Sequence, residues 1–423
     1  MEHEELKIAV GSLKEGMFVY RLDREWLGTP FPLQGFEVRT DEDIEQLTRF
    51  CEHVYIDVLK SRGIDKRLLW LAALPRVEVG TASDTNHHDA VDPIAALVRN
   101  PIRYRNTVSL SEELPHANAA HLNAKTLASK IMEDVRAGRK MSAADVDEAV
   151  IPVVKSILRN VDAFFWIASL RKRDAYVYSH AINSSMLAAA FGRHLGFPED
   201  VLVSLASGGL LLDVGKAELP EDLLVHPGPL SSEQLQQIQK HVESGLRIFD
   251  QSGSRDDTVR DMIATHHERH DGSGYPNGLR ETQISLFGRM AAVIDTYDAM
   301  SSDRTYQKTV ARHEALQHIY RGRGKQFQGE VVEQFMQCLC IYPTGSLVEL
   351  STGQVAIVMA QNPARRLRPR VMILMNSDKQ LDSNFAEIDL MTHAMGEGAS
   401  PIEIVGTLEP GAYGLDPAEL YLG

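Results

Sequence analysis

The sequence predicts a multidomain α+β protein: a large α-helical domain, with a small α/β module before it and a β-rich extension after it. Between Tyr176 and Gln337, apolar residues repeat at helical spacing and short polar turns separate the repeats. The first 60 or so positions mix strand-like runs with one amphipathic pattern, and β-type runs follow Cys340. We therefore expect four segments: an N-terminal module at 1–75, a linker and helix at 76–140, the helical domain at 141–340 and the extension at 341–423.

Composition narrows the class of protein. The 423 residues carry a net charge of −14, with 43% hydrophobic and 24% charged residues, which is typical of a soluble globular protein. A nucleic acid or an anionic membrane as main partner would require a basic face, so we expect neither. Three cysteines, an acidic start and no apolar run long enough to span a bilayer favour a cytoplasmic protein.

The N-terminal module is predicted to contain strands at 6–10, 17–20 and 53–58 and a short helix that begins at Asp41. It shows no residues with obvious chemistry. Its aromatic side chains are expected to form its core, namely Trp26, Phe31 and Phe36.

The next segment is polar and poorly periodic over residues 77–114, with the clearest linker at 81–92. Helical spacing resumes at Leu122 and again over 146–165, where Pro152 predicts a break or kink.

The extension is predicted to contain strands at 347–350, 355–359 and 371–375, with another near 402–405. A basic cluster separates two of them and is expected to be a solvated turn, with an acidic partner as the alternative. Its members are Arg365, Arg366, Arg368 and Arg370.

The most informative stretch runs from His266 to Pro276. Two adjacent histidines end a helix-like pattern, and the following turn contains Gly272 and Gly274, which tolerate positive φ, before a rigid proline. Imidazole binds transition metals, so this pattern favours a metal site with a shaped rim. A helix C-terminus followed by an ordinary turn would give the same pattern, so this stretch alone does not distinguish a metal site from an ordinary helix end.

Further histidines and carboxylates lie near the ends of other apolar helices. Each has a simpler explanation by itself: Asp213 could end a helix, and Asp298 could be a solvated carboxylate. Together they match the way in which helical bundles build metal sites, and bridging carboxylates with imidazoles suit paired divalent ions that clamp a phosphoryl group. The residues are His180, Asp213 with Lys216, His241, His266 with His267, and Asp295 with Asp298.

These residues resemble the HD-GYP family, a subgroup of the HD metal-dependent phosphohydrolases that hydrolyses the bacterial messenger cyclic di-GMP. The N-terminal module and the β-rich extension also resemble the uncharacterised N-terminal domain and the C-terminal extension of one HD-GYP subgroup. The segments that carry the resemblance in the helical domain are Tyr178–His180, Leu212–Lys216, His241 with Gly245, His266–Pro276, Asp295–Met300 and Asp303–Tyr306.

The resemblance implies one or two divalent transition-metal ions, Fe or Mn first and Ni or Zn as alternatives. It implies two ligand sets that share one carboxylate: His180, Asp213 and Asp295 for one ion, and Asp213, His241, His266 and His267 for the other. The activity implied is hydrolysis of cyclic di-GMP to pGpG, and in some members to GMP, by metal-activated water. Asp213 and Lys216 are the implied catalytic residues, with Lys216 beside the scissile phosphate.

The resemblance also implies contacts with substrate and with a partner protein. Arg304, with Lys308 nearby, would pair with a substrate phosphate, and the loop would shape the rim through Gly274, Tyr275 and Pro276. In this family the loop is implicated in contacts with GGDEF-domain proteins.

Three positions depart from the family pattern. Leu212 stands where the family has the histidine of its His-Asp pair, which removes an imidazole from the first ligand set. Tyr176 stands where some members carry a glutamate, which argues against a third ion, and Gln307 stands at an often basic position.

Three alternatives to a cyclic di-GMP phosphodiesterase remain: a catalytically degenerate cyclic di-GMP receptor or scaffold, an enzyme for another phosphoester, and histidines without metal. The oligomeric state is left open.

Overall fold

The computed structural model describes residues 5–24, 35–57, 60–62, 98, 100–169, 176–224, 228, 230–302, 310–362, 365, 367–382, 384–392, 401–409 and 411–415. The chain forms two compact units, Met1–Asn86 and His87–Gly423, and each is described by itself. Among the described helices, none has the length and apolar character needed to cross a membrane.

The first unit is an antiparallel sheet with one helix. The strands are β1 (Glu5–Ala9), β2 (Phe18–Leu22), β3 (Phe36–Glu37) and β4 (His53–Asp57), in the order β1-β4-β2-β3. The helix α1 (Asp41–Phe50) begins at a capping box in which Thr40 and Asp43 satisfy each other's backbone N–H groups. The predicted strands and helix are confirmed, β3 was not predicted, and Trp26 and Phe31 lie outside the described residues.

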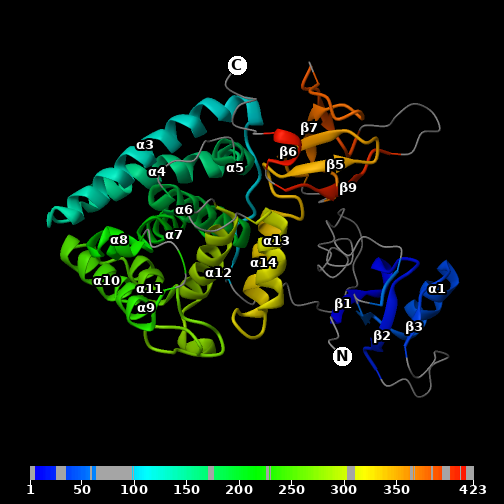
Figure 1. Ribbon diagram of the computed structural model, residues 1–423, viewed down its shortest axis with the longest axis horizontal. Coiled ribbons are helices and arrows are strands. Elements are labelled where there is room, and N and C mark those ends of the chain that lie inside the picture. The colour runs from blue at the N-terminus through cyan, green and yellow to red at the C-terminus, as the bar shows by residue number, and fades with distance from the viewer. Residues whose placement is uncertain are drawn as a thin grey trace. The chain divides into compact units, whose positions relative to one another are not determined.

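The second unit contains most of the helices (Figure 1). They are α3 (Leu110–Arg136), α4 (Ala143–Arg159), α5 (Val161–Ser169), α6 (Tyr176–Leu195), α7 (Glu199–Leu211), α8 (Glu221–Leu224), α9 (Ser232–Gln239), α10 (His241–Ser252), α11 (Asp257–Thr265), α12 (Leu286–Ser301), α13 (Arg312–Arg321) and α14 (Gly329–Leu339). A short 3-10 segment, Val214–Glu218, follows α7. The predicted α-helical domain is confirmed.

Two glycines let backbones approach closely near the end of α7. A Cβ on Gly209 would lie 2.5 Å from the carbonyl oxygen of Ser184 in α6, and a Cβ on Gly215 would lie 1.9 Å from the carbonyl oxygen of His241 in α10. Larger residues cannot occupy these positions without moving a helix. These contacts bring the end of α7 beside both α6 and the N-terminus of α10.

The predicted start of one helix and the predicted break within another are wrong. Helix α3 begins at Leu110 rather than near Leu122, because Ser109 caps a first turn that is mostly polar and whose buried residues include Glu113. Pro152 does not break α4, whose buried valines pack on both sides of the proline. The chain leaves the helix instead at Asn160, whose side-chain oxygen accepts the backbone N–H of Asp162 at the start of α5.

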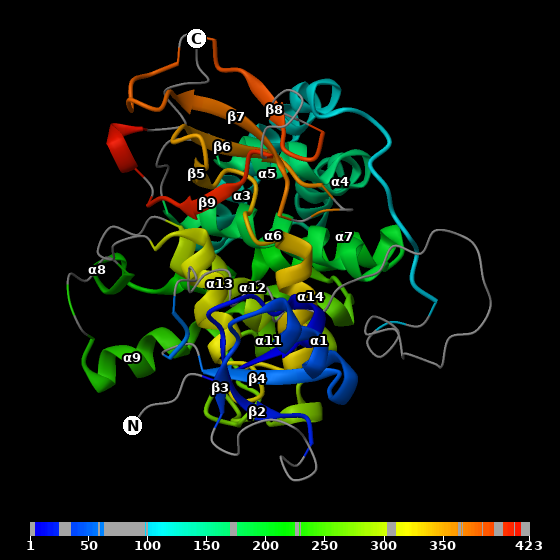
Figure 2. The ribbon, with the colours of Figure 1, turned by 90° about the vertical axis from the view of Figure 1, so that its right-hand side faces the viewer.

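The β-rich extension is a five-stranded antiparallel sheet within the second unit (Figure 2). Its strands are β5 (Leu347–Leu350), β6 (Val355–Ala360), β7 (Arg370–Met375), β8 (Glu387–Asp389) and β9 (Ile404–Thr407), in the order β8-β7-β6-β5-β9. The predicted strands are confirmed, and the short polar β8 was missed. Arg368 and Arg370 of the basic cluster pair with Glu403 and Glu387 of the same sheet.

Asp162 at the start of α5 joins this sheet to the helices. Its carboxylate is 4% exposed and accepts the backbone N–H of Gln361 at 3.1 Å and the hydroxyl of Thr344 at 3.3 Å. Burial raises the pKa of the Asp162 carboxyl to about 6, despite these donors.

Candidate metal centre

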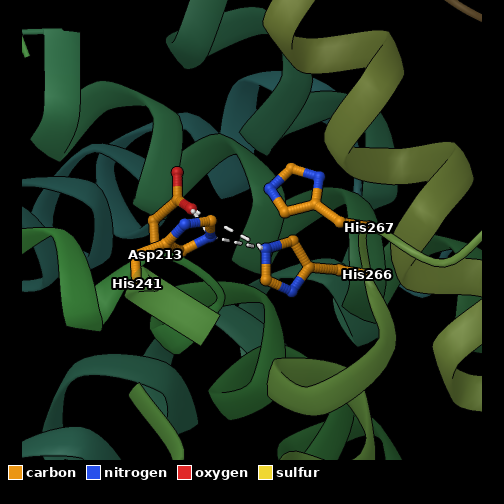
Figure 3. A group of neighbouring side chains, drawn as sticks. All are labelled: Asp213, His241, His266 and His267. Atoms are coloured by element: carbon orange, nitrogen blue, oxygen red, sulfur yellow. Dashed lines mark hydrogen bonds and ion pairs between the residues drawn. The ribbon is translucent and has the colours of Figure 1, made fainter. Parts of the chain in front are cut away.

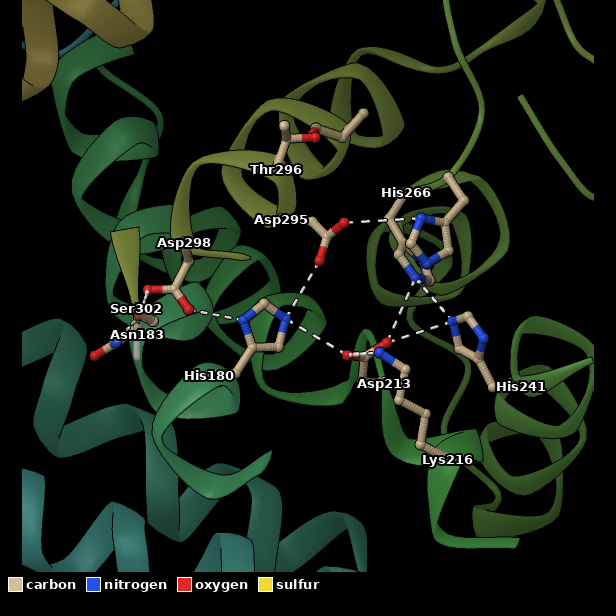
Figure 4. Close-up of polar contacts among 12 residues, drawn as sticks. His180, Asn183, Asp213, Lys216, His241, His266, Asp295, Thr296, Asp298 and Ser302 are labelled. Carbon is tan, nitrogen blue, oxygen red and sulfur yellow. Dashed lines mark hydrogen bonds and ion pairs between the residues drawn. The ribbon is translucent and has the colours of Figure 1, made fainter. Parts of the chain in front are cut away.

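The predicted ligands converge from the ends and inner faces of five helices (Figure 4). His180 lies on α6, Asp213 directly follows α7, His241 begins α10, the histidine pair follows α11, and Asp295 lies on α12. Two groups of potential ligand atoms result, each lying within 4.8 Å: Asp213, His241, His266 and His267; and His180, Asp213 and Asp295. Asp213 belongs to both.

The four-residue group is almost entirely buried (Figure 3). The Nε2 atom of His241 lies 3.3 Å from Asp213 Oδ1 and 3.2 Å from Nε2 of His266. Each of these rings donates its Nδ1–H to a backbone carbonyl, at 2.7 Å for Ile238 and 2.9 Å for Ile263. In the neutral rings, the two Nε2 lone pairs therefore face each other.

A cation fits this arrangement. Burial lowers the pKa of His241 to about 4, so the ring stays neutral at pH 7, and burial together with neighbouring His266 lowers the pKa of His267 to about 2. Asp213 Oδ1 is buried and has no hydrogen-bond partner among the described residues. Neutral imidazoles with a carboxylate are a suitable donor set for a divalent transition metal, which would satisfy the facing lone pairs.

The three-residue group differs because His180 already contacts carboxylates on both sides. Its Nε2 lies 3.2 Å from Asp295 Oδ1 and 3.5 Å from Asp213 Oδ2, and its Nδ1 lies 2.7 Å from Asp298 Oδ2. Burial opposes a charge on His180, but the hydrogen bonds with Asp295 and Asp298 outweigh it and raise the pKa to about 10. Asp295 is buried as well, yet the contact with His180 holds its pKa well below the usual range.

Lys216 stands at the edge of the site. Its Nζ atom lies 2.5 Å from Asp213 Oδ2, and its side chain is 21% exposed. The charge of Lys216 lowers the pKa of Asp213 against the effect of burial, so Asp213 remains ionised.

The loop after the histidine pair is fixed by Glu268. This side chain is 1% exposed and accepts the backbone N–H groups of Asn277 at 2.8 Å and Leu279 at 2.9 Å. The ring of Tyr275 stacks on His267, and a Cβ on Gly274 would lie 2.4 Å from the carbonyl oxygen of His267. The loop therefore packs directly against the ligand segment.

The structure brings together all six predicted metal ligands with Lys216, while their roles stay predictions. Gly274 and Tyr275 are half-buried at the rim and Pro276 is exposed, whereas Arg304 and Lys308 lie outside the described residues. For Asp298 the sequence left two alternatives, a solvated carboxylate or a member of the site; the residue is 3% exposed and contacts His180. Its spacing of three residues from Asp295 on one helix was the available signal.

Three family models match the chain: the HD domain over residues 164–331, a domain of unknown function over 5–146, and a KOW domain associated with the HD domain over 347–395. A Pseudomonas aeruginosa protein named cyclic di-GMP phosphodiesterase PA4108 is 32% identical over 386 residues, which is 91% of this chain and 88% of that protein.

Two further relatives match shorter parts of the chain. A Thermotoga maritima protein named cyclic di-GMP phosphodiesterase is 36% identical over 39% of this chain and 45% of its own length. A Vibrio cholerae protein named 3'3'-cGAMP-specific phosphodiesterase 2 is 33% identical over 40% of this chain and 32% of its own length. With the domain order and the long match to the Pseudomonas protein, the chain belongs to the HD-GYP family, in the subgroup with an N-terminal domain of unknown function.

Proposed function

We propose that this chain is a metal-dependent phosphodiesterase that hydrolyses cyclic di-GMP to pGpG, with cleavage of pGpG to GMP as a second step. The observation that carries the proposal is Asp213, which is shared by two buried groups of ligand atoms and contacts Lys216. The relative that matches nearly the whole chain carries the name of this activity, which supports the same substrate.

Divalent ions held by these residues would supply positive charge for a phosphate and lower the pKa of a water molecule. The protein residues hold the potential ligand atoms in place through contacts with neighbouring groups. His241 and His266 are oriented by their bonds to backbone carbonyls, and Asp295 by its contact with His180. Such positioning reduces the reorganisation required when charge develops on the phosphate.

Lys216 is proposed to act on the leaving oxygen as proton donor and charge stabiliser. It is the partly exposed cation in direct contact with Asp213, so its ammonium can meet a phosphate that enters from solvent. There it can neutralise charge on the phosphate and donate a proton to the leaving 3′ oxygen.

The rim around Tyr275 is the proposed binding edge for substrate and partner. Burial raises the pKa of the Tyr275 hydroxyl well above its usual range, so the group remains a hydrogen-bond donor. Pro276 and Ser273 of the same loop are exposed, which leaves an edge that a GGDEF-domain protein can contact. Arg304 and Lys308 are proposed to pair with the substrate phosphates, because guanidinium and ammonium groups suit them.

The metal is proposed to be Fe(II) or Mn(II), with Ni(II) and Zn(II) as alternatives, because nitrogen and oxygen donors of this kind accept all four. The low cysteine content supports a cytoplasmic location, where cyclic dinucleotide messengers are found.

The test is turnover by the full chain, reconstituted anaerobically with Fe(II) or Mn(II) and supplied separately with cyclic di-GMP, 3'3'-cGAMP and pGpG. Chromatography of the products distinguishes one cut from two. We expect cyclic di-GMP to be cleaved, and Lys216→Ala to lower kcat by about 10²–10⁴-fold, as for loss of a general acid. Lys240→Ala, an exposed lysine beside the site in sequence, is the matched control and should retain full activity.

Absence of turnover in metal-loaded protein that still binds cyclic di-GMP would overturn the proposal in favour of a receptor. Preferential cleavage of 3'3'-cGAMP would retain the chemistry and replace the substrate.

A further inference from the structure

The two halves of the metal centre differ in how well their polar atoms are satisfied before any ion binds. The difference concerns the contacts of Asp213, whose two oxygens face different neighbours. This inference rests on the proposed metal-dependent function and adds an order of binding to it.

On one side, Asp213 Oδ1 is buried and has no hydrogen-bond partner among the described residues. The two nearest ring nitrogens, Nε2 of His241 and of His266, lie 3.3 and 3.8 Å from it and 3.2 Å from each other. Both rings contact backbone carbonyls through Nδ1, which leaves their Nε2 atoms beside Asp213 Oδ1 as potential ligand atoms. A buried carboxylate oxygen without a donor is unfavourable.

On the other side, Asp213 Oδ2 already accepts a hydrogen bond from Lys216. Asp213 Oδ2 lies 2.5 Å from Lys216 Nζ and 3.5 Å from His180 Nε2, and Asp295 Oδ1 lies 3.2 Å from the same ring nitrogen. His180 is in turn fixed through Asp298, which also accepts the hydroxyl of Ser302 at 2.8 Å.

An ion entering the first side meets four protein ligands and satisfies Asp213 Oδ1, which has no hydrogen-bond partner among the described residues. An ion entering between His180, Asp213 and Asp295 has to share Asp213 Oδ2 with Lys216, which already donates a hydrogen bond to it. It also finds three protein ligands rather than four, and Leu212, the residue before Asp213, is 1% exposed and carries no donor atom.

We propose that the centre fills in a fixed order: one divalent ion binds tightly between Asp213, His241, His266 and His267, and a second binds more weakly between His180, Asp213 and Asp295. The dissociation constants of the two sites should differ by at least about tenfold, which is the size of effect that changes around a metal site have on affinity. The resting protein then contains one ion at limiting metal, and the second site is occupied only as the metal concentration rises.

The test is titration of metal-free full-length protein with Mn(II), in which the free ion is counted by its EPR signal and dialysed samples are checked by elemental analysis. Wild-type protein should show one tight and one weak site. His180→Ala should lose only the weak site, and His241→Ala should lose the tight one. Circular dichroism shows whether the variants fold, and Asp295→Asn and His267→Ala form a second matched pair if either does not.

Two sites of equal affinity in the wild type, or loss of the tight ion in His180→Ala and Asp295→Asn, would overturn the order of binding. Neither result bears on turnover of cyclic di-GMP, which is measured separately. Loss of turnover with the order intact would overturn the proposed function alone, whereas protein that binds no Mn(II) would overturn both.

Discussion

The ring of Tyr275 stacks on the ring of His267, with centroids 4.5 Å apart and planes inclined by 25°. The backbone N–H of Tyr275 also donates to the carbonyl oxygen of His267 at 3.2 Å. The rim loop and the histidine pair therefore form one packed unit, and a substitution at the rim should alter the position of the His267 ring.

Replacing Tyr275 by alanine should weaken metal binding. Stacked aromatic pairs contribute about 0.5–1.5 kcal/mol beyond the area they bury, so Tyr275→Ala should lower the affinity for the tight ion by roughly 3- to 10-fold. Tyr275→Phe retains the ring and should stay within about twofold. Mn(II) titration measures both, and equal losses in the two variants would assign the effect to the hydroxyl.

Glu268 should matter for stability although it contacts no predicted ligand atom. In the wild type, each carboxylate oxygen of Glu268 accepts one backbone N–H of the loop. Glu268→Gln replaces one of these oxygens by an amide NH₂, which cannot accept a hydrogen bond and so faces a backbone N–H. Leaving a buried donor unsatisfied costs about 1–3 kcal/mol, which should appear as a lower midpoint of urea unfolding. Glu243→Gln, on the exposed face of α10, is the control; an unchanged midpoint in Glu268→Gln would contradict the prediction.

The helical fold was predictable because buried residues recur at helical spacing along the sequence, as α4 and α10 illustrate. The start of α3 was missed because its first turn is polar, although Ser109 and Glu112 form a capping box that could have located it. The strand β8 was missed because its three residues carry almost no pattern.

The convergence of the predicted metal ligands could be anticipated because histidines and aspartates lie near the ends of several apolar helices and match the HD-GYP pattern. The role of Glu268 could not, because its partners are backbone N–H groups, and these leave no mark on the side-chain pattern. A solvated Asp298 remained an alternative because the sequence does not say whether the end of α12 is exposed, whereas the structure places His180 of α6 against it.

Stability should depend on pH through Asp162. Its pKa is raised from 3.8 to about 6 on folding, so the folded state holds the proton of this carboxyl more tightly than the unfolded state. The resulting contribution to the free energy of unfolding is fully present below pH 4 and is lost as the pH rises through 6. The free energy of unfolding therefore falls by about 3 kcal/mol between pH 4 and neutral pH on account of Asp162. Asp162→Asn cannot ionise, so the stability gap between variant and wild type, from urea unfolding, should widen in favour of the variant from pH 5 to pH 7. A gap that is independent of pH would contradict the raised pKa.

Position 212 offers a gain-of-binding prediction. Leu212 is buried directly before Asp213, the ligand shared by both groups, and a histidine there adds the imidazole that the family pattern places at this position. Leu212→His should therefore tighten the weaker ion by about 10- to 100-fold, judged from the effect of changes around metal sites, and raise turnover at limiting Mn(II).

Leu211→His is the matched control for Leu212→His, because Leu211 is equally buried one position earlier. Leu211→His also buries an imidazole, at a similar cost in stability, but it should not raise the affinity of the weaker site for Mn(II). If Leu212→His folds and its Mn(II) titration matches the wild type, position 212 does not reach the group of His180, Asp213 and Asp295. The low affinity of the weaker site would then come from the contact that Lys216 already makes with Asp213 Oδ2.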